Sequence, residues 1–129
     1  MRRLLSDERG STPVEFVLVG VLLTVLTLGV LQLGLAVYVR NVVHDAAVEG
    51  AYYAALADVE TAAGAERARE VAERAVGSDF VESATATDSR TLGYETVSVT
   101  LKTRLPIIGL LGVPRGWEVT VHAPAESFD

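Results

Sequence analysis

A single glutamate at the entrance to a long apolar stretch is the residue of this sequence whose position most needs a chemical explanation. Glu15 is the only Asp, Glu, His, Lys or Arg between Val14 and Val39. A carboxylate at the start of a helix meets the positive end of the helix dipole, which stabilises its charge. The position of Glu15 is therefore consistent with a structural role at the start of a helix.

Residue patterns that would indicate an enzyme or a cofactor site are missing from the sequence. Cysteine is absent, which excludes disulfides, thiolate metal sites and a cysteine nucleophile. His44 and His122 lie far apart, without a carboxylate or histidine at metal-ligand spacing. There is also no P-loop, nucleophile elbow or dinucleotide-binding fingerprint. We therefore predict no catalytic residue, no metal and no cofactor.

The composition indicates one membrane segment followed by one small domain. The chain has 129 residues, 50% of them hydrophobic, with a formal net charge of −6. Phe16–Val39 is an apolar run of 24 residues, interrupted only by Thr24, Thr27, Gln32 and Tyr38. At about 1.5 Å rise per residue, a helix of this length exceeds the ~30 Å hydrocarbon core of a bilayer. The acidic balance argues against nucleic-acid binding, because such a surface repels phosphate.

The residues that flank the apolar run predict that it is retained and how it is oriented. A secretory signal has a shorter apolar stretch and a small-residue cleavage site after it, whereas Arg40 follows this run directly. Arg2, Arg3 and Arg9 precede the run, and Arg40 is the only Arg or Lys among the twenty residues after it. By the positive-inside rule, we expect a single-pass protein of the cytoplasmic membrane with its N-terminus inside and its C-terminal domain outside.

The stretch Arg9-Gly10-Ser11-Thr12-Pro13-Val14-Glu15-Phe16 lies immediately before the apolar run. A charged leader that ends in glycine, with a glutamate five residues later, resembles the processing site of type IV pilin-like precursors. The resemblance implies cleavage between Gly10 and Ser11 by a prepilin-type peptidase. It divides the chain into a leader (1–10), a transmembrane helix (11–40) and an extracytoplasmic pilin-like α+β domain (41–129). It also implies that Glu15 neutralises the free amine of a neighbouring subunit.

Two further stretches narrow the resemblance, Tyr38-x-Arg40-Asn41 and the alanine-rich segment from Asp45 to Ala55. They are similar to the TadE-like family of minor pilin-like proteins (pseudopilins) in tight-adherence, or Flp-type, pilus systems. The resemblance covers Gly10 to about Ala57. Tyr52 stands where the family usually has a basic residue, so the role of that charge does not carry over.

Glu15 also has a simpler interpretation as part of a helix cap. Thr12 at the N-cap, Pro13 at the first helical position and Glu15 at the third would form a capping box. Such a cap needs neither a peptidase nor a polymer. The two interpretations are compatible, and we favour processing and assembly because a cap does not require Gly10.

The helix is predicted to run from Pro13 to about Leu56. Beyond the apolar run, small and apolar residues share one face: Val39, Val42, Val43, Ala46, Ala47, Gly50, Ala54 and Ala57. Within that face, Ala46-x-x-x-Gly50-x-x-x-Ala54 would let another element approach closely. That element is either the chain's own C-terminal domain, which we favour, or another subunit.

The remainder predicts an α+β domain. Asp58–Gly64 is expected as a turn, and Ala65–Val76 as a second helix that ends at Gly77. Alternating apolar and polar residues predict strands at 94–105 and 117–123, and a weaker third strand at 80–87. An antiparallel sheet of about three strands, packed on the long helix, completes the predicted fold.

Residues 106–114 join the two clearer strands and are unusually apolar for a connection. Two interpretations stay open: a cover for the domain core, or an exposed patch for a pilus component or a membrane leaflet. The large aliphatic residues of this candidate partner patch are Ile107, Ile108, Leu110, Leu111 and Val113.

The function that we predict is participation in the assembly of a tight-adherence pilus, and thereby in cell adhesion. The expected partners are a prepilin peptidase, other pilin-like subunits, membrane pilus-assembly proteins and the lipid bilayer, and the pilus or cell surface is a further expected location. The alternative is an uncleaved single-pass signal-anchor protein whose outer domain binds an envelope partner. Retention of residues 1–10 would favour that alternative.

Overall fold

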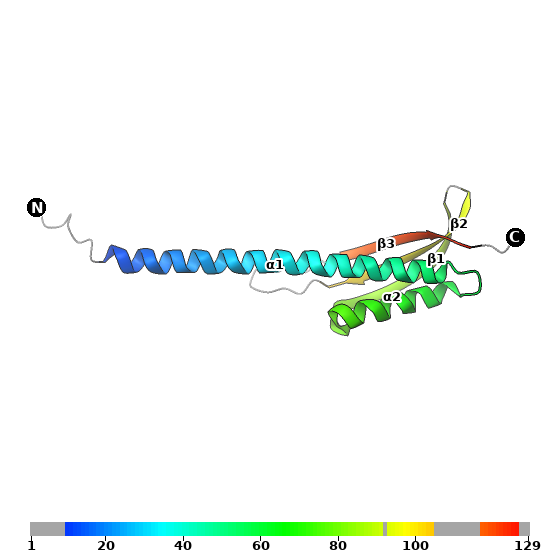
Figure 1. Ribbon diagram of the computed structural model, residues 1–129, viewed down its shortest axis with the longest axis horizontal. Coiled ribbons are helices and arrows are strands. Elements are labelled where there is room, and N and C mark those ends of the chain that lie inside the picture. The colour runs from blue at the N-terminus through cyan, green and yellow to red at the C-terminus, as the bar shows by residue number, and fades with distance from the viewer. Residues whose placement is uncertain (1–9, 92, 105–116, 127–129) are drawn as a thin grey trace, which may run out of the picture. The chain divides into compact units, whose positions relative to one another are not determined.

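The fold consists of one long helix, one shorter helix and a three-stranded sheet (Figure 1). The computed structural model describes residues 10–91, 93–104 and 117–126. The elements are α1 (Ser11–Ala54), α2 (Thr61–Val76), the short 3-10 helix η1 (Ser78–Phe80), β1 (Val81–Thr91), β2 (Tyr94–Thr103) and β3 (Trp117–Pro124). The chain divides into two units, residues up to Gly34 and residues from Leu35. The predicted α+β class is confirmed.

The part of α1 that precedes Leu35 exposes its apolar side chains. Phe16, for example, is 80% exposed. Thr24 and Thr27 donate their hydroxyls to backbone carbonyls one turn earlier, each at 2.8 Å, so these polar groups are satisfied within the helix. Among the described residues, α1 is the one helix long and apolar enough to cross a membrane. Its exposed apolar surface fits a lipid environment.

The part of α1 that follows Gly34 buries one face. The buried residues are mainly small: Val39, Val43, Ala46, Ala47, Gly50, Ala51 and Ala54. The helix ends at Ala54, two residues before the predicted end. Ala57 lies beyond it and is exposed. The prediction that Ala57 belongs to the packed face is therefore wrong.

Helix α2 begins at Thr61, so the predicted turn over 58–64 is wrong in its second half. Glu60 has extended backbone angles, and the helix continues through the buried Gly64 to Val76. Threonine and glycine are typical of turns, but here Gly64 serves a close contact between helices. The predicted stop at Gly77 is confirmed. Its φ of 96° favours glycine, and its N–H donates to the Glu73 carbonyl at 2.9 Å.

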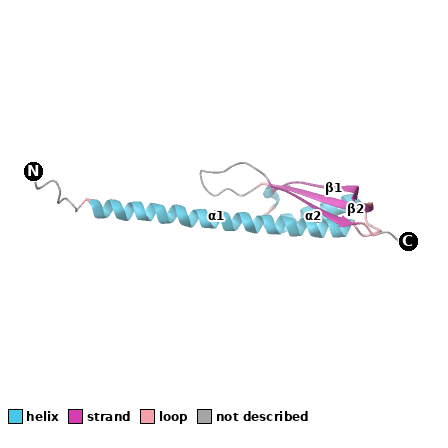
Figure 2. Ribbon diagram, turned by 90° about the horizontal axis from the view of Figure 1, so that it is seen from above, coloured by secondary structure: helices cyan, strands magenta, loops and turns pink. Residues whose placement is uncertain are grey.

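The sheet is antiparallel, with strand order β1-β2-β3. Figure 2 shows its strands in magenta beside α2. In the central strand β2, one face is buried through Val97, Val99, Leu101 and Thr103, and Ser98 of the other face is buried as well. Strand β2 ends at Thr103, before the predicted end at 105. Strand β1 runs to Thr91, farther than the predicted 87, because it pairs with β2 along a hairpin that closes at Thr91 and Tyr94. Gly93, with a φ of 87°, lies in the turn.

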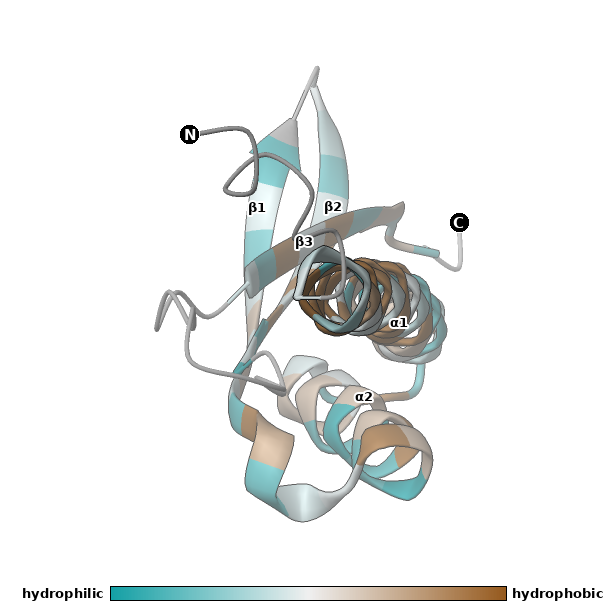
Figure 3. Ribbon diagram, turned by 90° about the vertical axis from the view of Figure 1, so that its left-hand side faces the viewer, coloured by the Kyte–Doolittle hydropathy of each residue, from teal (hydrophilic) through white to brown (hydrophobic). Residues whose placement is uncertain are grey.

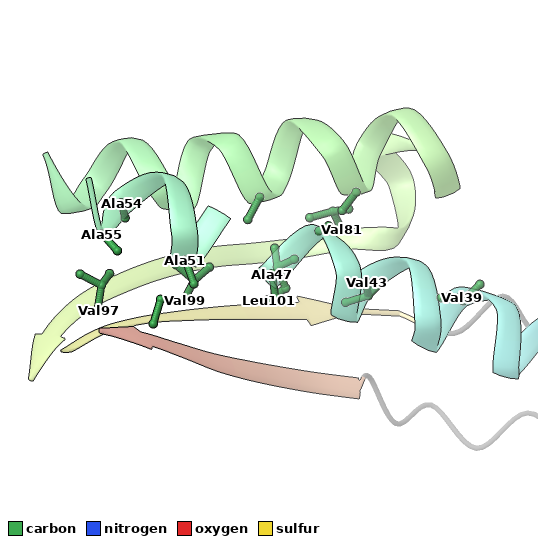
Figure 4. Packing of buried hydrophobic residues seen from close by; sticks show 14 residues of the cluster. Val39, Val43, Ala47, Ala51, Ala54, Ala55, Val81, Val97, Val99 and Leu101 are labelled. Atoms are coloured by element: carbon green, nitrogen blue, oxygen red, sulfur yellow. The ribbon is translucent and has the colours of Figure 1, made fainter. Parts of the chain in front are cut away.

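The core of the second unit forms where α1, α2 and the sheet meet. In Figure 3, seen along α1, β3 and α2 lie on two sides of that helix. Val99 and Leu101 of β2 are fully buried and belong to the same cluster as Ala47 and Ala51 of α1 (Figure 4). The α2 stripe contributes Ala65, Ala68 and Ala72. Because alanine buries little area, this core depends on close approach of the backbones.

Candidate functional site

The predicted cleavage bond lies at the start of α1. Gly10 is exposed and stands in a turn, and the helix begins at the next residue, Ser11. A methyl group added at Gly10 would meet no atom within 4 Å. The predicted bond therefore joins an exposed turn residue to the first residue of the helix.

Glu15 lies one turn into α1 with its side chain exposed. Among the described residues, no hydrogen bond or ion pair involves its carboxylate. The capping box lacks its expected geometry, because Thr12 is already inside the helix and no described side-chain hydrogen bond joins Thr12 and Glu15. The structure thus presents a carboxylate in an apolar segment with no described partner to offset its charge.

The series Ala46, Gly50 and Ala54 lies on the buried face of α1, and α2 lies close to Gly50 and Ala54. A Cβ built on Gly50 would lie 2.5 Å from the carbonyl oxygen of Gly64 and 2.6 Å from the Cβ of Ala68. A Cβ on Gly64 would lie 2.6 Å from the Gly50 carbonyl oxygen. The two glycines therefore face each other at a crossing that has no room for a side chain. The chain's own second helix occupies this part of α1.

Ion pairs border the crossing on the exposed side of α2. The Nη2 atom of Arg67 lies 2.7 Å from the Glu49 carboxylate of α1, and its Nε donates to the same oxygen at 2.9 Å. Arg69 binds Glu73 at 2.8 Å, and this hydrogen bond and charge raise the pKa of Arg69 above its ordinary value. The side chains of these pairs are partly solvated, so each pair contributes little to stability.

The two histidines lie on different elements and serve different contacts. The Nδ1 atom of His122, in β3, lies 2.6 Å from the Ser98 hydroxyl of β2. His44, in α1, lies 4.0 Å from Asp45 and is exposed. Within the described ranges, no group of three or more His, Cys, Asp or Glu residues could hold a metal ion. The apolar residues of the candidate partner patch, between 107 and 113, lie outside the described residues.

One contact that the sequence analysis did not identify joins α1 to the start of β3. The Arg40 guanidinium lies over the ring of Trp117, 5.7 Å from its centroid. Each residue stands out in the sequence by itself, since Arg40 is the first charged residue after the apolar run and Trp117 is the only tryptophan. No pattern in the sequence predicts that these two residues, more than seventy positions apart, are in contact.

The fold and the site define a protein in which an apolar helix of membrane-spanning length leads into a small α+β domain. Residues 10–51 match the family described as TadE-like protein, so the resemblance predicted from the sequence is confirmed over this segment. The matched segment begins at Gly10 and includes Glu15, Arg40 and Gly50. This family suggests a role in tight-adherence pilus systems. No curated protein and no solved structure matches the chain.

Proposed function

We propose that the chain is a minor pilin-like membrane protein that a prepilin-type peptidase cleaves after Gly10, and that it takes part in the assembly of a tight-adherence pilus. The observation that carries the proposal is Glu15. It is a carboxylate without a described partner, five residues after Gly10 and inside the segment that matches the TadE-like family. Its position calls for a cation that the described residues of this chain do not supply.

Cleavage would create that cation on a neighbouring subunit. A carboxylate within a membrane costs several kcal/mol unless it is paired. Cleavage after Gly10 would leave a free ammonium group on Ser11, at the positive end of the α1 dipole, where a positive charge is unfavourable. A charge-assisted hydrogen bond between Glu15 of one subunit and Ser11 of the next would relieve both costs. The pairing therefore links processing to assembly.

The proposed location and partners follow from this arrangement. The chain lies in the cytoplasmic membrane as a single span (11–40), with the leader (1–10) inside and the domain (41–129) outside. The peptidase, other pilin-like subunits and the membrane pilus-assembly proteins are its partners, and adhesion is the process served. Because α2 covers the Gly50 face, contacts with other subunits fall on other surfaces, including the exposed apolar side chains before Leu35.

The decisive experiment determines the N-terminal residue of the membrane-bound protein. The full chain is expressed with and without a prepilin-type peptidase, and the intact mass and N-terminal peptide are measured by mass spectrometry. The expected product begins at Ser11 only when the peptidase is present. A product that retains residues 1–10 under both conditions would overturn the proposal and support an uncleaved signal anchor.

Two matched variants separate assembly from helix capping. Glu15→Gln should still be cleaved but should lose co-purification with pilin-like subunits, because the amide cannot neutralise the Ser11 ammonium. Thr12→Ala removes the hydroxyl that a capping box requires and should leave co-purification unchanged. If both variants lost co-purification to the same degree, the proposed role of Glu15 in subunit pairing would be wrong.

A further inference from the structure

We infer that Arg40 and Trp117, together with His44, form a binding site for the phosphate of an anionic phospholipid headgroup. The site lies on the second unit, where the first turns of α1 after Gly34 run beside the start of β3. It is independent of cleavage and of the proposed pairing of Glu15, and it concerns how the domain contacts the membrane surface.

The site is a surface groove between α1 and β3. Its lining residues are Arg40, His44, Trp117, Glu118, Val119 and Thr120. Arg40 and His44 are four residues apart and therefore lie one above the other on α1. The groove thus offers guanidinium and imidazole N–H donors and an indole ring within one concave surface, a combination suited to a phosphate attached to an apolar group.

The charge of Arg40 is available to a ligand. Four other arginines of the described residues, and Lys102, have a carboxylate within 4.0 Å: Arg67, Arg69, Arg74 and Arg90. Within the same ranges, no salt bridge involves Arg40. A guanidinium that lies over an aromatic ring keeps N–H donors at its edge, and these match phosphate geometry. Trp117 therefore positions the guanidinium without neutralising it.

The carboxylates near the groove leave this charge largely uncompensated. Glu118 lines the groove, but its carboxylate lies 3.4 Å from the Lys102 ammonium of β2. Asp45 lies 4.0 Å from His44, and its side chain is 86% exposed. Neither carboxylate forms a salt bridge with Arg40 among the described contacts. An anion can therefore approach Arg40 from solvent.

The position of Arg40 in the sequence favours a lipid over a soluble phosphate. Arg40 is the first charged residue after the apolar run, so it reaches the headgroup layer if α1 spans the bilayer. Tryptophan is enriched at the same depth, because its ring is apolar and its N–H is polar. A basic residue and an indole at one interface are the groups expected to hold an anionic headgroup.

The test uses Trp117 as a reporter, because it is the only tryptophan in the chain. The full chain is reconstituted in vesicles of phosphatidylcholine or of phosphatidylcholine mixed with phosphatidylglycerol. Its fluorescence and its quenching by aqueous acrylamide are then measured. We expect the anionic lipid to shift the emission and to protect the indole from quenching. Each variant is compared with its own signal in pure phosphatidylcholine, and circular dichroism verifies its fold.

Substitutions then identify the residues responsible. Arg40→Gln should raise by about fivefold the fraction of phosphatidylglycerol needed for the half-maximal change, since one basic residue near an anionic surface contributes about a factor of this size. His44→Gln, which leaves the Arg40–Trp117 contact in place, should raise it by a smaller factor. Arg104→Gln is the matched control, because Arg104 is exposed, forms no described salt bridge and does not line the groove; it should leave the response unchanged.

Three outcomes would overturn the assignment. An identical Trp117 signal in the two kinds of vesicle would show that the groove does not bind an anionic headgroup. If Arg40→Gln and Arg104→Gln raised the required fraction of phosphatidylglycerol equally, the lipid would attract the positive charges of the domain in general and would not bind at a specific site. If inorganic phosphate added to phosphatidylcholine vesicles reproduced the shift, and Arg40→Gln abolished it, the ligand would be a soluble phosphate and not a lipid.

Discussion

Before Leu35, α1 carries large aliphatic side chains that are exposed, whereas its buried face from Val39 onward consists of alanine, glycine and valine. Leu26 in the first region is 60% exposed, while Ala46 and Ala47 in the second are fully buried. Both regions are apolar, yet their side chains differ in size. The first has the composition of a surface for lipid, and the second has that of a surface for another backbone.

The comparison shows that hydropathy and packing are separate properties of one helix. In the first region, large side chains increase the apolar area that can contact a bilayer, and they are largely exposed. In the second, a Cβ on Gly50 would lie 2.5 Å from the Gly64 carbonyl oxygen, so added bulk has no space. The same type of substitution should therefore change the stability of the domain by different amounts in the two regions.

The largest expected difference is between truncations of leucine inside and outside the core. Leu101→Ala should destabilise the domain by about 3 kcal/mol, because Leu101 is fully buried and its removal leaves a cavity. Leu26→Ala, at an exposed position, should leave domain stability unchanged. The measurement is urea unfolding of the full chain in detergent micelles, followed by Trp117 fluorescence. Equal unfolding midpoints for the two variants would contradict the assignment of Leu101 to the core.

The next largest effect concerns glycine at the crossing of α1 and α2. Gly50→Ala should destabilise the domain by roughly 2 kcal/mol, since its Cβ would meet backbone atoms of α2 that cannot move aside independently. Gly20→Ala is the control, because a Cβ at Gly20 meets nothing within 4 Å and alanine favours the helix. Thermal unfolding by circular dichroism tests the pair. A Gly50→Ala variant as stable as the wild type would show that the two helices can separate without cost.

The smallest effect is expected for the ion pair between α1 and α2. Arg67→Gln removes the contact with Glu49 and should cost roughly 0.5 kcal/mol, because both side chains are substantially exposed. The loss should shrink in high salt, which screens the wild-type pair. Arg74→Gln disrupts a pair within α2 alone and provides the comparison. A cost that does not change with salt would argue that Arg67 acts through packing of its aliphatic part.

Local patterns predicted most of the elements. Alternation indicated most of the buried side chains of β2, although Ser98 of its polar face is buried too, and the placement of Gly77 indicated the end of α2. The region from Asp58 to Gly64 was predicted less well. Threonine and glycine are common in turns, so the local sequence predicts a turn. The close contact of Gly64 with Gly50 accounts for a glycine inside helix α2. A local pattern cannot contain the information of that distant contact.

The same limit applies to the candidate sites. Gly10, Glu15 and Gly50 could be selected because their neighbours in sequence give them a context, such as an apolar run or a spacing of four residues. The partner of Arg40 could not be selected, since Trp117 reaches it through the packing of β3 beside α1. Contacts between elements depend on how the sheet docks on the helix, which no single stretch of sequence specifies.

The order of strands in the sheet is the same as their order along the chain. During synthesis, each strand can therefore join the edge formed by the strand made just before it, and no later strand has to be inserted between two that are already paired. Strand β2 can pair with β1 as soon as their hairpin emerges, and β3 then joins the free side of β2. The hydrogen bond from the Glu126 N–H to the Ala55 carbonyl, at 2.8 Å, forms only after β3 is complete. The domain can thus be assembled in the direction of translation, with Glu126, which is made after β3, fastening the residue that follows α1.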